Sequence, residues 1–178
     1  MFSLLRRLFR RRDEFVGYGV EIVESTSSVC ELYRRAAVAL GAGEVDRARA
    51  LYERAQSLEP CNAQAFIGLG TCALRVRDPA QAVKYFKAAL KLDATSASAH
   101  VGLGSAHFQL RRYAHAAESY VRAAHLRGDL ADAHLGAAST FAKLNEHTKK
   151  RAHAVRYLEL APDSSHAPYV RTMLETSG

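Results

Sequence analysis

The chain has 178 residues, 48% of them hydrophobic, with 25 Lys and Arg against 18 Asp and Glu and a formal net charge of +7. This length suits one compact domain or a short repeat array. The sequence has Ala at 32 positions and only 4 Pro, which favours close-packed helices over sheets, collagen-like chains or low-complexity sequence. The 3 cysteines lack CxxC spacing and are odd in number, which argues against a disulfide framework or a zinc site.

Residues 1–12 are basic, with five arginines and no acidic residue. On a helix, their Phe and Leu side chains fall within one arc and most of the arginines lie on the other side. Such a helix can lie in a membrane interface near anionic headgroups. The membrane-surface candidates are Phe2, Leu5, Arg6, Arg7, Phe9, Arg10 and Arg11. An unstructured basic tail and an Arg-rich organelle presequence remain open as alternatives.

Residues 13–28 contain four acidic residues and no Lys or Arg, together with Gly17 and Gly19. We expect them to form an acidic linker. No apolar run of the whole chain approaches the ~18 residues that cross a bilayer. The expected location is therefore the cytoplasm, either free or peripheral at the inner face of a membrane.

From residue 29 onward the sequence repeats itself every 34 residues. Aromatic residues recur at Tyr52, Phe86 and Tyr120, and small residues recur at Ala48, Ala82, Ala116, Ala55, Ala89 and Ala123. This pattern resembles the tetratricopeptide repeat (TPR) family, whose unit is a pair of antiparallel helices. The resemblance implies an all-α TPR solenoid with units at 29–62, 63–96, 97–130 and 131–164.

The fourth unit departs from the family pattern. Lys150 and Ala154 occupy its small and aromatic positions, so either its second helix is shifted by an insertion or it is a divergent end repeat. Because stacked helical pairs need a closing helix at their end, residues 165–178 are expected to form a capping helix and tail. The expected array thus has three clear units and one degenerate unit.

In TPR arrays the first helices of the units line a concave face. The resemblance places there a mostly apolar groove made of Tyr33, Ile67, Gly68, Thr71, Leu74, Val101, Gly102, Ser105, Phe108, Leu135 and Gly136. A glycine inside a helix costs ~1 kcal/mol relative to Ala, so the three aligned glycines need a reason. We expect them to let a bound segment approach the helix backbone. The alternative is that they only ease packing between helices and that the chain's own N-terminus covers the apolar stripe.

The expected function is that of a non-enzymatic adaptor or scaffold that binds an apolar peptide or helix of a partner protein. The Lys/Asn/Arg clamp with which some TPR domains hold a carboxylate is absent from the matching positions, which carry residues such as Tyr33, Ala37 and Gly68. A weaker similarity, around Gly68-Leu69-Gly70 and Cys72, is to class II type III secretion chaperones. A chaperone that shields a hydrophobic client is therefore the alternative function.

Catalytic, metal and cofactor sites are not expected. Phosphate-binding, dinucleotide, zinc-protease and nucleophile-elbow motifs are missing, and the eight histidines are interpreted as packing or surface residues. The expected groove has almost no charge, which disfavours nucleic acid relative to an acidic protein or an anionic membrane surface. Self-association through the ends of the array stays open.

Overall fold

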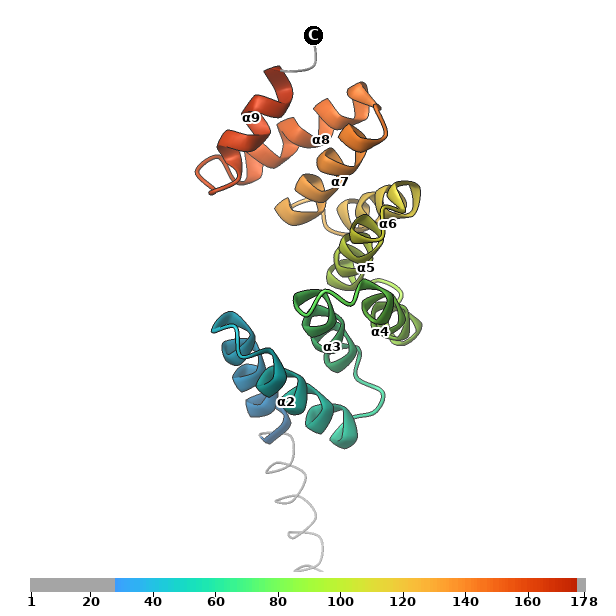
Figure 1. Ribbon diagram of the computed structural model, residues 1–178, viewed down its shortest axis with the longest axis vertical. Helices are drawn as coiled ribbons and strands as arrows, with labels where there is room; N and C mark the ends of the chain where they lie inside the picture. The colour runs from blue at the N-terminus through green and yellow to red at the C-terminus, as the bar shows by residue number, and fades with distance from the viewer. Residues whose placement is uncertain (1–27, 176–178) are drawn as a thin grey trace, which may run out of the picture. The chain divides into compact units, whose positions relative to one another are not determined.

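The computed structural model describes residues 28–175, and all regular structure in that range is helical. The first helix covers residues 28–41, and the others follow in chain order (Figure 1). They are α2 (Val45–Leu58), α3 (Ala63–Arg75), α4 (Pro79–Leu92), α5 (Ala97–Gln109), α6 (Tyr113–Leu126), α7 (Ala131–Lys143), α8 (His147–Leu160) and α9 (Ala167–Glu175). The chain forms two compact units, one ending at Pro60 and the other beginning at Cys61.

In the first unit the helix over 28–41 and α2 form one helical pair. Ala36 and Ala48 are fully buried, so two small residues allow the helices to approach closely. The rings of Tyr33 and Tyr52 lie with their centroids 6.4 Å apart. Burial raises the pKa of Tyr33, and its hydroxyl has no hydrogen-bond partner among the described residues.

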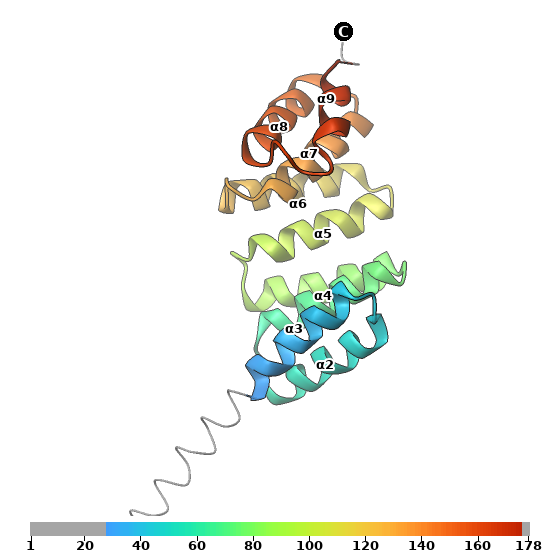
Figure 2. The same ribbon diagram turned by 90° about the vertical axis from the view of Figure 1, so that its left-hand side faces the viewer.

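The second unit repeats the same pair three times and adds a final helix. α3 packs on α4, α5 on α6 and α7 on α8, while α4 also packs on α5 and α6 on α7 (Figure 2). The first helices begin at Ala63, Ala97 and Ala131, which are equally spaced by 34 residues. The second helices begin at Pro79, Tyr113 and His147 with the same spacing. The sequence period is therefore the structural period.

The turn within each pair has one conformation in all four repeats. One residue there has a positive φ: 82° at Gly43, 61° at Arg77, 57° at Arg111 and 57° at Asn145. At the end of α3 the Asp78 amide donates to Ala73 O at 2.9 Å and the Arg77 amide to Leu74 O at 3.2 Å. These two bonds form a Schellman motif, which satisfies the last carbonyls of the first helix.

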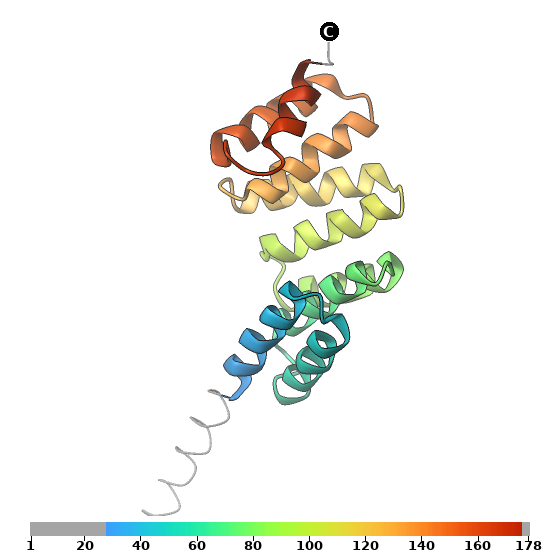
Figure 3. The same ribbon diagram turned by 60° about the vertical axis from the view of Figure 1, so that its left-hand side comes forward.

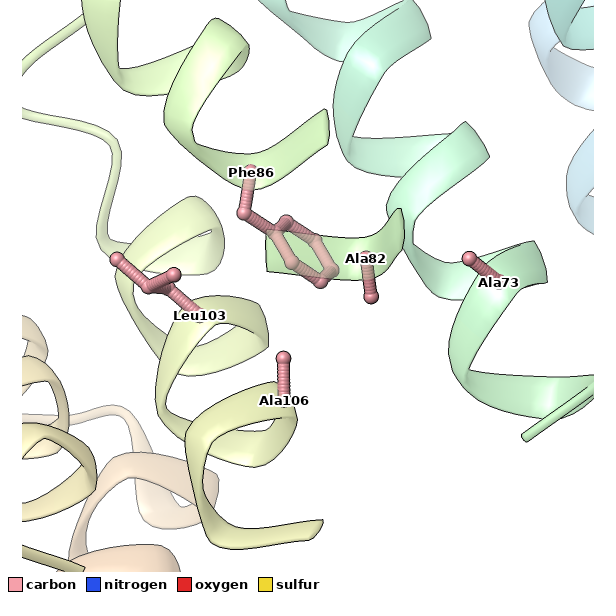
Figure 4. Packing of buried hydrophobic residues seen from close by; sticks show 5 residues of the cluster. All are labelled: Ala73, Ala82, Phe86, Leu103 and Ala106. Atoms are coloured by element: carbon pink, nitrogen blue, oxygen red, sulfur yellow. The ribbon is translucent and has the colours of Figure 1, made fainter. Parts of the chain in front are cut away.

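A buried aromatic ring joins each of the first two repeats of this unit to the next. Phe86 on α4 is 1% exposed and clusters with Ala82, Ala73, Leu103 and Ala106 (Figure 4). A Cβ on Gly102 of α5 would overlap this ring, and one on Gly70 of α3 would lie 2.8 Å from it. Since Gly lacks a Cβ, it lets the ring pack directly on the helix backbone.

The same arrangement recurs one repeat later. Tyr120 on α6 occupies the space that a Cβ on Gly136 would need, and it lies 3.0 Å from the corresponding position on Gly104. The expectation that Gly102 and Gly136 leave room for a bound segment is therefore wrong. The close approach that they permit is to a ring of the preceding second helix in the same chain.

The fourth repeat contains no insertion. α8 begins at the position that the 34-residue spacing requires, so this is a divergent end repeat with an unshifted second helix. Its aromatic residue, Tyr157, stands one helical turn later than Phe86 and Tyr120 do in their repeats. Tyr157 packs with Val170 and Met173 of α9, which lies against α8 (Figure 3).

Lys150 of this repeat is 4% exposed, and its Nζ donates to Met173 O at 3.0 Å. Met173 lies in the last turn of α9, where backbone carbonyls have no partner within the helix. The ammonium group thus satisfies a carbonyl at the negative end of the α9 dipole. The unusual Lys at a small-residue position is explained by the final helix that packs there.

Candidate binding groove

The second unit contains a hollow on its first helices, which we call the central groove. It has a volume of about 360 Å³. Its lining consists of Val101, Ser105, Phe108, Tyr120, Asp132, Leu135, Gly136 and Ser139. All of these lie on α5 and α7 except Tyr120, which reaches the groove from α6. The groove therefore spans the junction between the second and third helical pairs of this unit.

Apolar side chains make up much of the groove wall. Val101 and Phe108 are partly exposed and pack on the cluster around Tyr120 and Phe141. Leu135 is also partly exposed and packs on the cluster that joins α7, α8 and α9. Because their inner atoms are held by the core, these side chains present a preformed apolar surface. Such a surface with a few polar groups is the usual composition of a ligand site.

A hydrogen bond fixes the polar part of the groove. The hydroxyls of Ser105 and Tyr120 lie 2.9 Å apart, and Ser105 Oγ also donates to Val101 O at 3.1 Å. Burial raises the pKa of Tyr120, and the bond to Ser105 opposes that shift only in part. Tyr120 therefore stays a neutral phenol at physiological pH and cannot serve as an anionic group in the groove.

Asp132 gives the groove its charge. Asp132 and Tyr120 are the two ionisable residues of the described lining, and Tyr120 is neutral. Asp132 is exposed at the start of α7. An acidic residue in the first turn is favourable for the helix dipole, which accounts for its place there. A carboxylate beside an apolar surface favours a ligand that carries a positive charge next to its apolar side chains.

Five of the residues expected from the sequence meet in this groove: Val101, Ser105, Phe108, Leu135 and Gly136. The α3 residues Ile67, Gly68, Thr71 and Leu74 do not line it. Ile67 and Leu74 pack on the Phe86 cluster, and the Thr71 hydroxyl donates to Ile67 O at 2.9 Å. Gly102 lies under Phe86, and Tyr33 belongs to the first unit.

Three lining residues were not predicted from the sequence as part of the groove: Tyr120, Asp132 and Ser139. Asp132 and Ser139 occupy the second and ninth positions of their repeat, which face the same side as Leu135 and Gly136, so the repeat register was a sufficient signal for both. The sequence carries no such signal for Tyr120, because the aromatic position of the repeat predicts a residue that packs between neighbouring repeats. Its ring does pack there, while its hydroxyl reaches Ser105 in the groove.

The histidines are distributed between buried packing positions and the surface. His107 and His134 are 6% and 8% exposed, and Nδ1 of His134 lies 3.0 Å from Nδ1 of His153. Burial lowers the pKa of His100, His107, His134 and His153. Within residues 28–175 no group of three or more His, Cys, Asp or Glu side chains is placed to hold a metal ion.

The membrane-surface candidates of residues 1–12 lie outside the described residues. Among the helices that the structure does describe, we find none with the length and hydrophobicity of a membrane span.

Stacked helical pairs with a groove on their first helices define the class of helical-repeat binding scaffolds. Within this class, residues 33–97, 73–129 and 101–165 match the family model of the tetratricopeptide repeat, and the chain belongs to this family. TPR domains bind peptide partners and are generally non-enzymatic, so the fold supports a role in protein–protein interaction. A search of curated proteins finds no significant match.

Solved TPR structures share the fold. MamA is 23% identical with a TM-score of 0.69, covering 80% of this chain and 81% of that one. YrrB, described as a TPR protein with an unusual peptide-binding site, is 20% identical with a TM-score of 0.65, covering 83% and 76%. PilF of Pseudomonas aeruginosa is 15% identical with a TM-score of 0.77, covering 86% and 68%. At such identities the likeness shows the fold alone.

Proposed function

We propose that the protein is a non-enzymatic adaptor whose central groove binds an apolar segment of a partner protein. The observation that carries the proposal is the groove itself, where Val101, Phe108 and Leu135 form an accessible apolar wall beside Asp132. Exposed apolar surface of this kind in a folded domain usually marks an interaction site. The peptide-binding site named for YrrB supports the same use of the fold.

The chemistry of the wall specifies the partner segment. Apolar side chains fit against Val101, Phe108 and Leu135, and a Lys or Arg beside them pairs with Asp132. The hydroxyls of Ser105 and Ser139 can bond to the backbone of an extended segment. Ile67 and Leu74 occupy on α3 the repeat positions of Val101 and Phe108 on α5, and α3 packs beside α5, so we extend the binding surface along α3.

A displayed peptide library tests the groove. Selection on the wild-type chain should enrich peptides in which apolar residues flank a Lys or Arg. Val101→Glu places a charge in the wall and should abolish binding of the selected peptides. Val155→Glu is the matched control, because Val155 lies on α8, is 41% exposed and does not line the groove. Equal binding by both variants would reject the groove as the site.

The same peptides distinguish an adaptor from a chaperone. An adaptor should lose affinity when Asp132→Asn removes the charge, because its segment is recognised by sequence. A chaperone of the type III secretion kind should bind any long hydrophobic client whether or not a basic residue is present. If affinity depends only on the hydrophobicity of the peptide and Asp132→Asn has no effect, the adaptor hypothesis is rejected in favour of the chaperone.

We also propose that residues 1–12 tether the adaptor to an anionic membrane surface. The support is the sequence, in which four of the five arginines lie opposite an arc of Phe and Leu side chains. Because the segment is short, its affinity should be low and sensitive to salt. Flotation with phosphatidylserine vesicles compares the whole chain with one lacking residues 1–12. If neither floats, or both float equally, the tether is rejected.

A further inference from the structure

A second hollow, which we call the basic hollow, lies between α4, α5 and α6. Its volume is about 630 Å³. The lining consists of Lys87, His100, Leu103, His107, Arg112, His115, Glu118, Ser119, Val121, Arg122 and His125. Three fixed positive charges and four histidines thus face one hollow, against a single carboxylate. Neither the adaptor function nor the TPR pattern uses this concentration of cations.

The basic hollow and the central groove use different sides of α5. Val101, Ser105 and Phe108 line the groove, whereas His100, Leu103 and His107 line the hollow. At about 100° per residue the centres of these two faces are roughly 130° apart. A ligand in one site therefore does not occupy the other, and the two can be tested separately.

The cations of the hollow are not neutralised within the described chain. Lys87, Arg112 and Arg122 are exposed, and none of them has an acidic partner within 4.0 Å among residues 28–175. The ion pairs in that range lie elsewhere, as between Arg127 and Asp129. Unpaired cations gathered around a hollow attract an anionic ligand.

A buried histidine in the wall adds a second observation. His107 is 6% exposed, and its Nδ1 has no hydrogen-bond partner among the described residues. The exposed ring of His115 lies 5.4 Å from it, centroid to centroid. An unsatisfied buried nitrogen costs free energy, and a ligand carboxylate that reaches His107 Nδ1 would supply its missing partner.

The spacing of the charges indicates a chain of carboxylates. Arg112, the residue directly before α6, and Arg122 on α6 are ten residues apart, about 15 Å along the helix axis at 1.5 Å per residue. A single phosphate is much smaller than this distance, whereas an extended peptide spans it with about four or five residues at 3.3 Å each. The hollow has no Phe, Tyr or Trp in its wall, so bases could stack only on its histidine rings and arginine side chains.

We infer that the basic hollow binds an acidic segment of a partner protein, a short run of Asp and Glu residues held by Lys87, Arg112 and Arg122. The single acidic wall residue, Glu118, lies between the two arginines in the sequence. It repels the ligand's carboxylates, so these should bind toward the two ends of the hollow. This site is independent of the central groove, so the adaptor would contact acidic and apolar segments through separate surfaces.

Binding should strengthen at lower pH. His107 faces Lys87 of α4, Arg112 of the α5–α6 turn, and His115 and Glu118 of α6. Burial, followed by the positive charge of His115, Lys87 and Arg112, lowers the pKa of His107, so it is neutral at physiological pH without a ligand. A carboxylate in the hollow favours the protonated ring and raises that pKa, which links peptide binding to proton uptake.

The test measures fluorescence anisotropy of a labelled pentaglutamate peptide with the full chain at low salt. The variant Lys87→Gln/Arg112→Gln/Arg122→Gln should bind about tenfold more weakly or worse. The matched control Arg75→Gln/Lys143→Gln/Arg151→Gln removes the same charge from exposed sites outside the hollow and should stay within about twofold of wild type. Equal losses would mean nonspecific attraction to a basic chain and would overturn the inference.

Further arms identify the ligand class and the place of binding. Pentaglutamine should not bind, and a decathymidine oligonucleotide should bind more weakly than pentaglutamate. Tighter oligonucleotide binding that needs the three cations, or full displacement by an equal concentration of inorganic phosphate, would overturn the peptide assignment. In NMR spectra the His107 and His115 ring signals should move with pentaglutamate while those of His147 and His166 do not. The reverse pattern would also refute the site.

Discussion

The ring of Phe86 fills the space that a Cβ on Gly102 would need. The two residues belong to successive repeats, on α4 and α5, so their contact joins one helical pair to the next. Tyr120 and Gly136 form the same pair one repeat later. The aromatic residue on α4 or α6 and the glycine on the first helix that follows it therefore determine how closely these repeats stack.

Gly102→Ala should destabilise the protein by about 1–3 kcal/mol, because the added methyl group overpacks against Phe86. The ring is 1% exposed and cannot swing into solvent. This loss should outweigh the ~1 kcal/mol by which Ala favours a helix over Gly. Gly128→Ala is the control, since its Cβ would meet only Ala124 O at 3.8 Å. A denaturant midpoint that rises for Gly102→Ala would contradict the packing.

Two opposite substitutions test the left-handed residue of the repeat turns. Gly43→Ala should cost about 1 kcal/mol although nothing lies within 4 Å of its Cβ position, because φ there is 82°. Arg111→Gly should stabilise by up to about 1 kcal/mol, because φ is 57° at Arg111. Arg54→Gly, at an exposed position inside α2, should destabilise by about 1 kcal/mol. Urea unfolding of the three variants checks the signs, and a destabilised Arg111→Gly would refute the account.

Lys150→Ala should destabilise the C-terminal repeat by about 1–3 kcal/mol, because it removes the donor to Met173 O and leaves a cavity. Amide exchange should accelerate in α9 more than in α3. Lys150→Met keeps most of the aliphatic packing and removes only the ammonium group. If Lys150→Met exchanges as slowly as wild type, packing alone holds α9 and the hydrogen bond contributes nothing.

Stability should decrease as the pH falls below about 6.5. Burial lowers the pKa of His134 and His153 from the ordinary value of 6.5, so the unfolded chain takes up protons before the folded chain does. The contribution of these two rings to the free energy of unfolding is therefore fully present above pH 6.5. It is lost as the pH drops toward their folded-state pKa values. Protonation of both rings would also break the bond between their Nδ1 atoms.

Thermal unfolding between pH 7.5 and 5.5 measures this loss. His153→Asn should flatten the dependence, because it removes one titrating ring and the repulsion between the pair. The exposed His147, near the start of the same helix, is the matched control, and His147→Asn should leave the slope unchanged. Identical slopes for both variants would show that other groups control the acid sensitivity.

The repeat family and the all-α fold followed from local sequence, because the spacing of small and aromatic residues is itself the spacing of the helices. Tyr52, Phe86 and Tyr120 at 34-residue intervals were enough to place the helical pairs. The divergent fourth repeat was harder to interpret, since Lys150 and Ala154 break the pattern while α8 keeps its register. Only the presence of α9 explains a buried lysine there.

What the sequence determined by itself was thus the periodic part: which residues share a helix face, and that the first helices carry an apolar stripe. What only the tertiary structure decided was which neighbour each face meets. Gly102 and Phe86 are 16 positions apart in the sequence. The sequence alone does not reveal that the Phe86 ring fills the space where a side chain at position 102 would lie. The same holds for the basic hollow, whose cations come from α4, from the α5–α6 turn and from α6, and meet because α4 and α6 both pack on α5.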